Sequence, residues 1–114
     1  MATSGSAAEV RVDTVFSALA DPTRRHLVEA LAAQPGATAT GLASGLPISR
    51  QAVAKHLKLL AEAGLVCSHR SGREALFELD TEPLVEAVAW IDHVGAEWDR
   101  SLAGLKRLVE RRTS

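Results

Sequence analysis

The chain has 114 residues, enough for one domain with a modest core, and self-association would let it bury more apolar surface. Its composition is 46% hydrophobic and 24% charged, without the roughly 20-residue apolar run of a membrane span or the segments of a secretory signal, so we expect a cytoplasmic protein. The net charge of −1 does not by itself suggest a nucleic-acid partner, and the single cysteine, Cys67, excludes an internal disulfide framework and a metal site made of several thiolates of one chain.

The first third of the chain is predicted to form a tail and two helices. Residues 1–8 are small and polar, which is typical of a disordered tail. Apolar residues at helical spacing predict a first helix over residues 9–20. Asp21 and Pro22 predict the start of a second helix, because aspartate accepts hydrogen bonds from first-turn amides and proline has no N–H to satisfy there. A Gln-Pro-Gly run at residues 34–36 predicts its end.

The next two predicted helices are joined by a tight Leu-Pro-Ile turn. A short helix is expected over residues 38–46, with Thr38 or Thr40 as its cap. Ser49 is expected to cap the longer helix that follows, and Gly64 is the expected stop at its C-terminal end. Two helices joined in this way are typical of a helix-turn-helix unit, whose second helix enters the major groove of DNA.

The remaining sequence predicts a β-hairpin and a long helix. Strand-like runs over residues 65–70 and 73–79 flank a turn predicted at Ser71 and Gly72. The final helix is expected over residues 82–111, with apolar residues recurring at alternating steps of four and three, as in a coiled-coil seam. The seam residues are Leu84, Val88, Ile91, Gly95, Trp98, Leu102, Leu105 and Val109.

Basic side chains are concentrated in the helix-turn-helix and hairpin segments. Residues 49–73 carry five basic side chains against one acidic, whereas residues 1–48 and 74–114 have net charges of −1 and −4. A basic segment between acidic ones indicates a localised anionic partner. A solvated charge cluster is the alternative interpretation.

Three stretches of this sequence resemble the ArsR family of winged helix-turn-helix repressors. They read FSALADPTRRHLVEAL, LPISRQAVAKHLKLLAEAGLV and HRSGREALFEL, and the similarity covers residues 12–80. The fold expected from this resemblance is mainly α with a small β-hairpin: a winged helix-turn-helix domain over residues 9–111, in which residues 9–20 and 82–111 supply the dimerisation helices. The resemblance also implies a homodimeric repressor that binds an inverted-repeat operator.

The sequence departs from the metal-sensing members of that family. Their third helix carries a Cys-x-Cys pair, whereas the corresponding stretch here, TATGLASGL, has neither cysteine nor histidine. A second family metal site uses Asp and His of the last helix with a further His and Glu; this chain has Asp92, His93 and Glu97 but no second histidine after them. We therefore expect the metal-independent branch, with no metal and no cofactor. We also expect no enzymatic activity, because the sequence has neither a Gly-rich phosphate loop nor a nucleophile elbow.

The candidate DNA-contacting residues lie on the predicted recognition helix and on the wing. Arginine and glutamine make bidentate hydrogen bonds to guanine and adenine, and basic side chains also bind phosphates, which position a protein without reading sequence. The candidates are Ser49, Arg50, Gln51, Ala52, Lys55, His56, Lys58, Arg70 and Arg73. Ser49 as a pure helix cap and His56 as a structural hydrogen-bonding residue stay open. Arg24 and Arg25 are weaker candidates for DNA contact and are expected instead to pair with acidic groups inside the domain.

The candidate dimer interface combines apolar residues of the first and last helices. These residues are Val12, Val15, Phe16, Leu19, Trp90, Ile91, Val94, Trp98, Leu102 and Leu105. The two tryptophans are also compatible with a pocket for an unknown small-molecule effector. Cys67 is expected to be a buried small hydrophobe. Two other functions stay open: a winged-helix protein–protein interaction module without DNA binding, and a metal-responsive sensor with its site between subunits.

Overall fold

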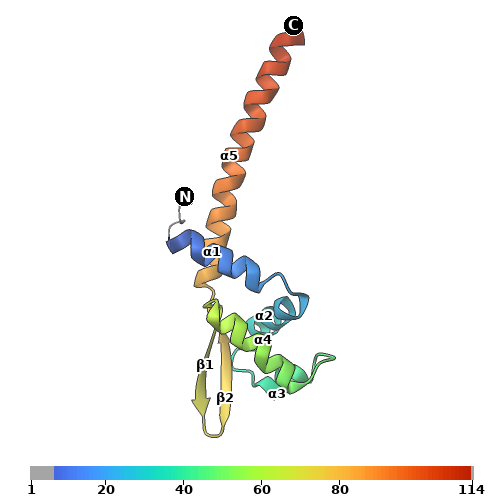
Figure 1. The fold of residues 1–114 in the computed structure, drawn as a ribbon, viewed down its shortest axis with the longest axis vertical. Helices are drawn as coiled ribbons and strands as arrows, with labels where there is room; N and C mark the ends of the chain where they lie inside the picture. Colours follow the sequence, from blue (N-terminus) through green and yellow to red (C-terminus); the bar gives the residue numbers. More distant parts are fainter. Residues whose placement is uncertain (1–6, 114) are drawn as a thin grey trace, which may run out of the picture.

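In a computed structural model, the backbone is described for residues 7–113 and the side chains for residues 11–111. This part of the chain folds into five helices and one two-stranded antiparallel sheet, in the predicted order of elements (Figure 1). The elements are α1 (Ala7–Ala18), α2 (Pro22–Ala33), α3 (Ala39–Ala43), α4 (Arg50–Glu62), β1 (Val66–Ser71), β2 (Glu74–Leu79) and α5 (Glu82–Thr113).

Helix α1 begins earlier than the sequence predicted. Ala7 and Ala8, which we placed in a disordered tail, are helical, and the rest of that predicted tail, residues 1–6, lies outside the described residues. Alanine has the highest intrinsic helix propensity, so two more alanines extend a helix at little cost.

The core is made by the apolar faces of the helices and by the start of the wing. Its most deeply buried side chains are Val15, Leu27, Leu31, Val53, Leu57, Leu60 and Leu65, each at most 1% exposed. Burying one such side chain contributes about 1.5–3 kcal/mol relative to leaving it in water. Three of the seven belong to α4, so this apolar contact fixes which face of α4 remains in solvent.

The predicted helix N-caps are present, and the structure decides between Thr38 and Thr40 as the cap of α3. Asp21 Oδ2 accepts a hydrogen bond from the Arg24 amide at 3.0 Å, and Ser49 Oγ accepts one from the Ala52 amide at 3.1 Å. Thr38, rather than Thr40, caps α3, its Oγ1 lying 3.0 Å from the Gly41 amide nitrogen. Helix α3 is shorter than the predicted 38–46, because the chain turns at Ser44 and Gly45 toward the tight turn before α4.

Helix α4 ends where the sequence predicted. Gly64 has φ +77°, and its amide bonds Ala61 O at 2.9 Å while the Leu65 amide bonds Leu60 O at 3.0 Å. This pair of bonds is the Schellman motif, which favours glycine because a side chain at positive φ is strained. The burial of both Leu60 and Leu65 completes the motif and directs the chain into β1.

The turn of the wing is shifted by one residue from its predicted position. The strands pair with Ser71 opposite Glu74, so Gly72 and Arg73 form the turn instead of Ser71 and Gly72. Gly72 has φ +62° and Arg73 has a negative φ, the pattern of a type II′ turn, whose twist matches that of the flanking strands. The base of the wing is tied to the helical body by hydrogen bonds of 2.9 Å between Phe77 and both Gly36 and Ala37.

Cys67 is exposed, and our expectation that it is buried is wrong. Successive side chains of a strand point to opposite faces. Val66 is buried against the core, so the next side chain, Cys67, points outward. The sequence shows two adjacent apolar residues and cannot show which of the two faces the helices.

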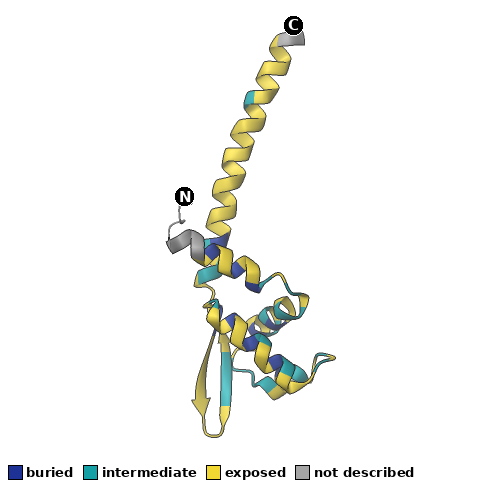
Figure 2. Ribbon diagram, viewed as in Figure 1, coloured by how far each residue is buried: buried dark blue, intermediate teal, exposed yellow. Residues whose placement is uncertain are grey.

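Helix α5 is a 32-residue rod, about 48 Å long at 1.5 Å per residue. Its first turns pack against α1, where Ala87 is buried, Arg11 Nε lies 2.8 Å from Glu86 Oε2, and the Phe16 and Trp90 rings meet edge to face at 5.7 Å. Beyond this junction α5 projects away from the other elements, and its surface is exposed (Figures 1 and 2). No described helix is long and apolar enough to cross a membrane.

Candidate nucleic-acid interface

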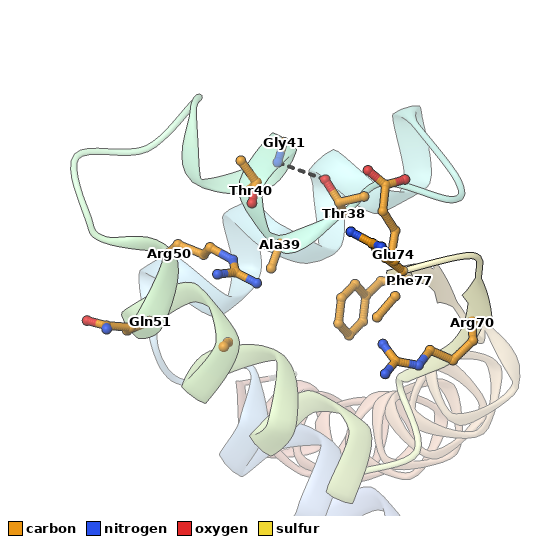
Figure 3. A pocket seen from close by; sticks show the side chains of 12 residues that line it. Thr38, Ala39, Thr40, Gly41, Arg50, Gln51, Arg70, Glu74 and Phe77 are labelled. Atoms are coloured by element: carbon orange, nitrogen blue, oxygen red, sulfur yellow. Dashed lines mark hydrogen bonds between the residues drawn. The ribbon is translucent and has the colours of Figure 1, made fainter.

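An open groove lies between α3, the N-terminal half of α4 and the wing (Figure 3). Its volume is about 760 Å³, and both polar and apolar side chains line it. Arg50 of α4 and Arg70 of β1 extend into it from opposite sides, while Gln51 points toward its outer edge. Arg73 of the wing turn also lines the groove. Two elements that are separated in the chain therefore present guanidinium groups to one concave surface.

The N-terminal end of α4 is held by local bonds that leave the next side chains free for contact. The Ser49 hydroxyl oxygen accepts the Ala52 amide, which fits its role as a cap, and its hydroxyl proton remains available to donate. Arg50 and Gln51 follow on the exposed side of the helix, and Ala52 is half-buried. A helix N-terminus also carries a partial positive charge, which favours phosphate.

The groove brings together four of the nine predicted DNA-contacting residues: Arg50, Gln51, Arg70 and Arg73. Lys55 and Lys58 are exposed on α4 outside the groove lining. His56 lies on the inner side of α4, where its Nδ1 is buried 3.9 Å from Asp21 Oδ2. This position favours the structural alternative for His56 over a phosphate contact.

Arg24 and Arg25 bind backbone carbonyls at the end of α1 instead of the acidic side chains we expected. Arg24 Nε donates to Ala18 O at 2.6 Å, and Arg25 Nη1 donates to Leu19 O at 2.6 Å. The last carbonyls of a helix lack intrahelical partners, so cationic side chains are favoured there. Sequence reasoning missed this because the two arginines belong to α2, and only the α1–α2 corner brings them to α1.

The pKa of the Asp21 carboxyl group is lowered at the corner between α1 and α2. Its pKa is lowered from 3.8, first by the hydrogen bond from the Arg24 backbone amide, and also by the charges of His56 and Arg24, whereas desolvation raises it. The carboxylate is therefore ionised near neutral pH and fixed in place by the first turn of α2.

Eight residues of the groove lining were not among the sequence candidates: Thr38, Ala39, Thr40, Gly41, Ala54, Glu74, Ala75 and Phe77. Thr40 lies on α3 with an exposed side chain, and Ala54 lies one turn after Arg50 on α4. The helical period of four residues from Arg50 was a signal that could have identified Ala54. No local signal identified Thr40, because its place beside α4 depends on the packing of α3.

The predicted dimer residues divide into two groups. Val12 and Val15 are 4% and 1% exposed inside one protomer, so including them in an interface surface was wrong. Val15 belongs to the hydrophobic core cluster of the same chain. Leu19 is half-buried, whereas exposed apolar surface is present at Phe16, Trp90, Ile91, Val94, Trp98, Leu102 and Leu105.

No group of three or more His, Cys, Asp or Glu side chains that could hold a metal ion is found among the described residues. His93 Nε2 lies 3.1 Å from Glu97 Oε1, one turn apart on the exposed surface of α5. The two residues belong to the incomplete counterpart of the family's second metal site, for which the sequence lacks a second histidine.

A helix-turn-helix followed by a hairpin wing, with arginines of both facing one groove, defines a winged helix-turn-helix DNA-binding protein. A family model described as "Helix-turn-helix domain" matches residues 19–68. The HTH-type transcriptional regulator Rv2034 of Mycobacterium tuberculosis is 41% identical over 98 residues, which cover 86% of this chain and 88% of that protein. The transcriptional repressor SdpR of Bacillus subtilis is 31% identical over 80 residues, 70% of this chain and 88% of that protein.

A solved structure, the ArsR-like transcriptional regulator from Rhodococcus sp. RHA1, superposes with a TM-score of 0.78 at 39% identity, covering 88% of this chain and 93% of that one. The chain belongs to the ArsR family of winged helix-turn-helix transcriptional regulators. It is a DNA-binding transcriptional regulator, as the sequence predicted.

Proposed function

We propose that this protein is a cytoplasmic, homodimeric repressor that binds an inverted-repeat operator and has no catalytic activity. The observation that carries the proposal is the groove in which Arg50 of α4 faces the wing arginines Arg70 and Arg73, with Gln51 at its outer edge (Figure 3). A relative named as a transcriptional repressor supports the direction of regulation.

Within the proposed complex, the two sides of the groove have different tasks. Arg50 and Gln51, in the first turn of α4, reach base edges in the major groove and supply sequence discrimination. Arg70 and Arg73 reach the backbone or the minor groove, and Lys55 and Lys58 bind phosphates along α4. A protein–protein module would have no use for basic side chains on both elements, so the groove favours DNA over the alternative.

The proposed dimer forms through α5, with a contribution from Phe16 of α1. The seam residues Ile91, Trp98, Leu102 and Leu105 are 47–64% exposed in the single chain. Exposed apolar surface of this extent marks an interaction site. A two-fold dimer covers it with the same surface of a second copy and places two recognition helices on one duplex, which is why the operator is expected to be an inverted repeat.

The charges of α5 favour an antiparallel arrangement of the two copies. By sequence, residues 82–99 carry five acidic and no basic side chains, whereas residues 100–113 carry five basic and one acidic. In an antiparallel pair, the acidic half of each helix lies beside the basic half of the other, and in a parallel pair like charges meet. Complementary charges fix orientation more than they add affinity.

Light scattering and fluorescence anisotropy test the proposal together. The purified protein is expected to have twice the mass of the chain and to bind a duplex of its own promoter more tightly than a shuffled duplex. Trp98→Glu is expected to give a monomer with weaker operator binding, because it places a charge in the seam. Ala96→Glu, which places the same charge at an exposed position of the same helix outside the seam, is the control. A monomeric wild-type protein that ignores duplex DNA at low salt would overturn the proposal and support a protein–protein module.

A further inference from the structure

One polar atom on the inner side of the recognition helix has no hydrogen-bond partner. His56 Nδ1 is buried, and within the described part of the chain no donor or acceptor satisfies it. Its nearest charged group is Asp21 Oδ2 at 3.9 Å. That distance exceeds the 2.7–3.2 Å typical of a hydrogen bond, so the two groups face each other without being bonded. A buried polar atom in this situation calls for an explanation.

Asp21 is held in place independently of His56. Its Oδ2 accepts the Arg24 amide at 3.0 Å, and the Arg24 guanidinium in turn donates to Ala18 O of α1 at 2.6 Å. The carboxylate is therefore anchored to both α2 and the end of α1. The charged groups that act on the Asp21 carboxylate are His56 and Arg24. On the helix of His56, Lys55 and Lys58 are its charged neighbours in the sequence, and both are exposed.

We propose that His56 is a positioning residue for DNA binding: in its protonated form it closes onto Asp21 and holds α4 at the angle at which the groove accepts DNA. A neutral imidazole has one N–H, so in one tautomer its Nδ1 lone pair faces the carboxylate and is repelled by it. A protonated imidazole donates from both nitrogens, so contact with Asp21 becomes an ion pair with a hydrogen bond. Closure by about 0.7 Å brings the two atoms from 3.9 Å to the upper end of the hydrogen-bonding range.

The contact acts on DNA binding because of its place on α4. The apolar side of α4, with Val53, Leu57 and Leu60 in the core, allows the helix to tilt only slightly. His56 follows Arg50 by six residues, and a tilt at His56 shifts the start of the helix where Arg50 enters the groove. Through Arg24, the same network reaches α1, which packs on α5. The polar contacts therefore link the recognition helix to the helices at the proposed dimer interface.

The first test is the pH dependence of operator affinity between pH 8 and pH 6, the range in which histidine changes its charge. The wild-type protein is expected to bind about threefold to tenfold more tightly at pH 6 than at pH 8, because the contact between protonated His56 and Asp21 holds α4 in place. His56→Gln is expected to lose most of this dependence, because its amide does not titrate. His26→Gln is the control, since His26 is an exposed histidine of α2 that lies outside the groove lining.

The second test needs no DNA, and so separates this inference from the proposed operator binding. Asp21→Asn, His56→Gln and the double variant form a cycle in urea unfolding, and asparagine keeps the cap of α2 because it is as good an N-cap as aspartate. The coupling between the two positions is expected to be larger at pH 6 than at pH 8. Equal coupling at both pH values, or an unchanged pH dependence of DNA affinity in His56→Gln, overturns the inference.

Discussion

Arg50 offers the most direct test of how the groove reads DNA. The side chain lies in the first turn of α4 and extends into the groove from the side opposite Arg70 (Figure 3). If its guanidinium pairs with a guanine, Arg50→Ala removes a bidentate contact that discriminates between bases by about 1–3 kcal/mol. At room temperature this corresponds to a loss of operator affinity of about fivefold to 150-fold.

A matched substitution on the same helix separates base contact from phosphate contact. Lys58 is exposed on α4 outside the groove lining, and Lys58→Ala removes one positive charge as Arg50→Ala does. A lost phosphate contact weakens operator and random DNA alike and makes the log–log salt slope less negative by about 0.9. Arg50→Ala is expected to lower operator affinity much more than random-DNA affinity, whereas Lys58→Ala lowers both by similar factors.

Fluorescence anisotropy with operator and shuffled duplexes at four salt concentrations measures both quantities. The informative value is the ratio of the two dissociation constants, because affinity alone mixes specific and non-specific terms. If Arg50→Ala weakens both duplexes equally and changes the salt slope by about one phosphate, Arg50 is a phosphate contact and the assignment of base recognition to it is refuted.

Three further predictions concern the stability of the same framework. Leu57→Ala, at a side chain 1% exposed, is expected to lower the free energy of unfolding by about 2–5 kcal/mol in urea; a loss below about 1 kcal/mol would mean that the core packing around α4 is wrong. Because the pKa of Asp21 is lowered from 3.8, its contribution to stability is present above its unfolded pKa and is lost as pH falls through the lower folded value. Asp21→Asn should therefore weaken the fall in the free energy of unfolding at acidic pH. If that fall is the same in the variant, the ionised Asp21 carboxylate does not stabilise the fold. Gly72→Val puts a β-branched residue at φ +62° and is expected to lower the melting temperature, while Ser71→Val, beside it on the strand, should not; equal effects would contradict the type II′ turn.

The features predicted correctly from the sequence are those set by interactions between residues close together in the chain. Asp21, Ser49 and Gly64 were identified correctly as helix boundaries, since a cap joins groups no more than five residues apart. The order of elements followed from the same local signals and from the period of the apolar residues. The resemblance to a family added the homodimeric repressor and its inverted-repeat operator.

Contacts between distant segments were decided only by the tertiary structure. The sequence presents Val12 and Trp90 alike as apolar residues on helical faces, but the fold buries the first within the protomer and leaves the second exposed. It likewise directs Cys67 outward, and seats His56 beside Asp21, 35 positions earlier in the chain. Periodicity specifies that a helix or strand has an inner face, but which residues cover that face depends on how all the elements pack together. Local chemistry therefore determined where each element of this protein begins and ends, and packing determined which side chains remain available to DNA or to a second copy.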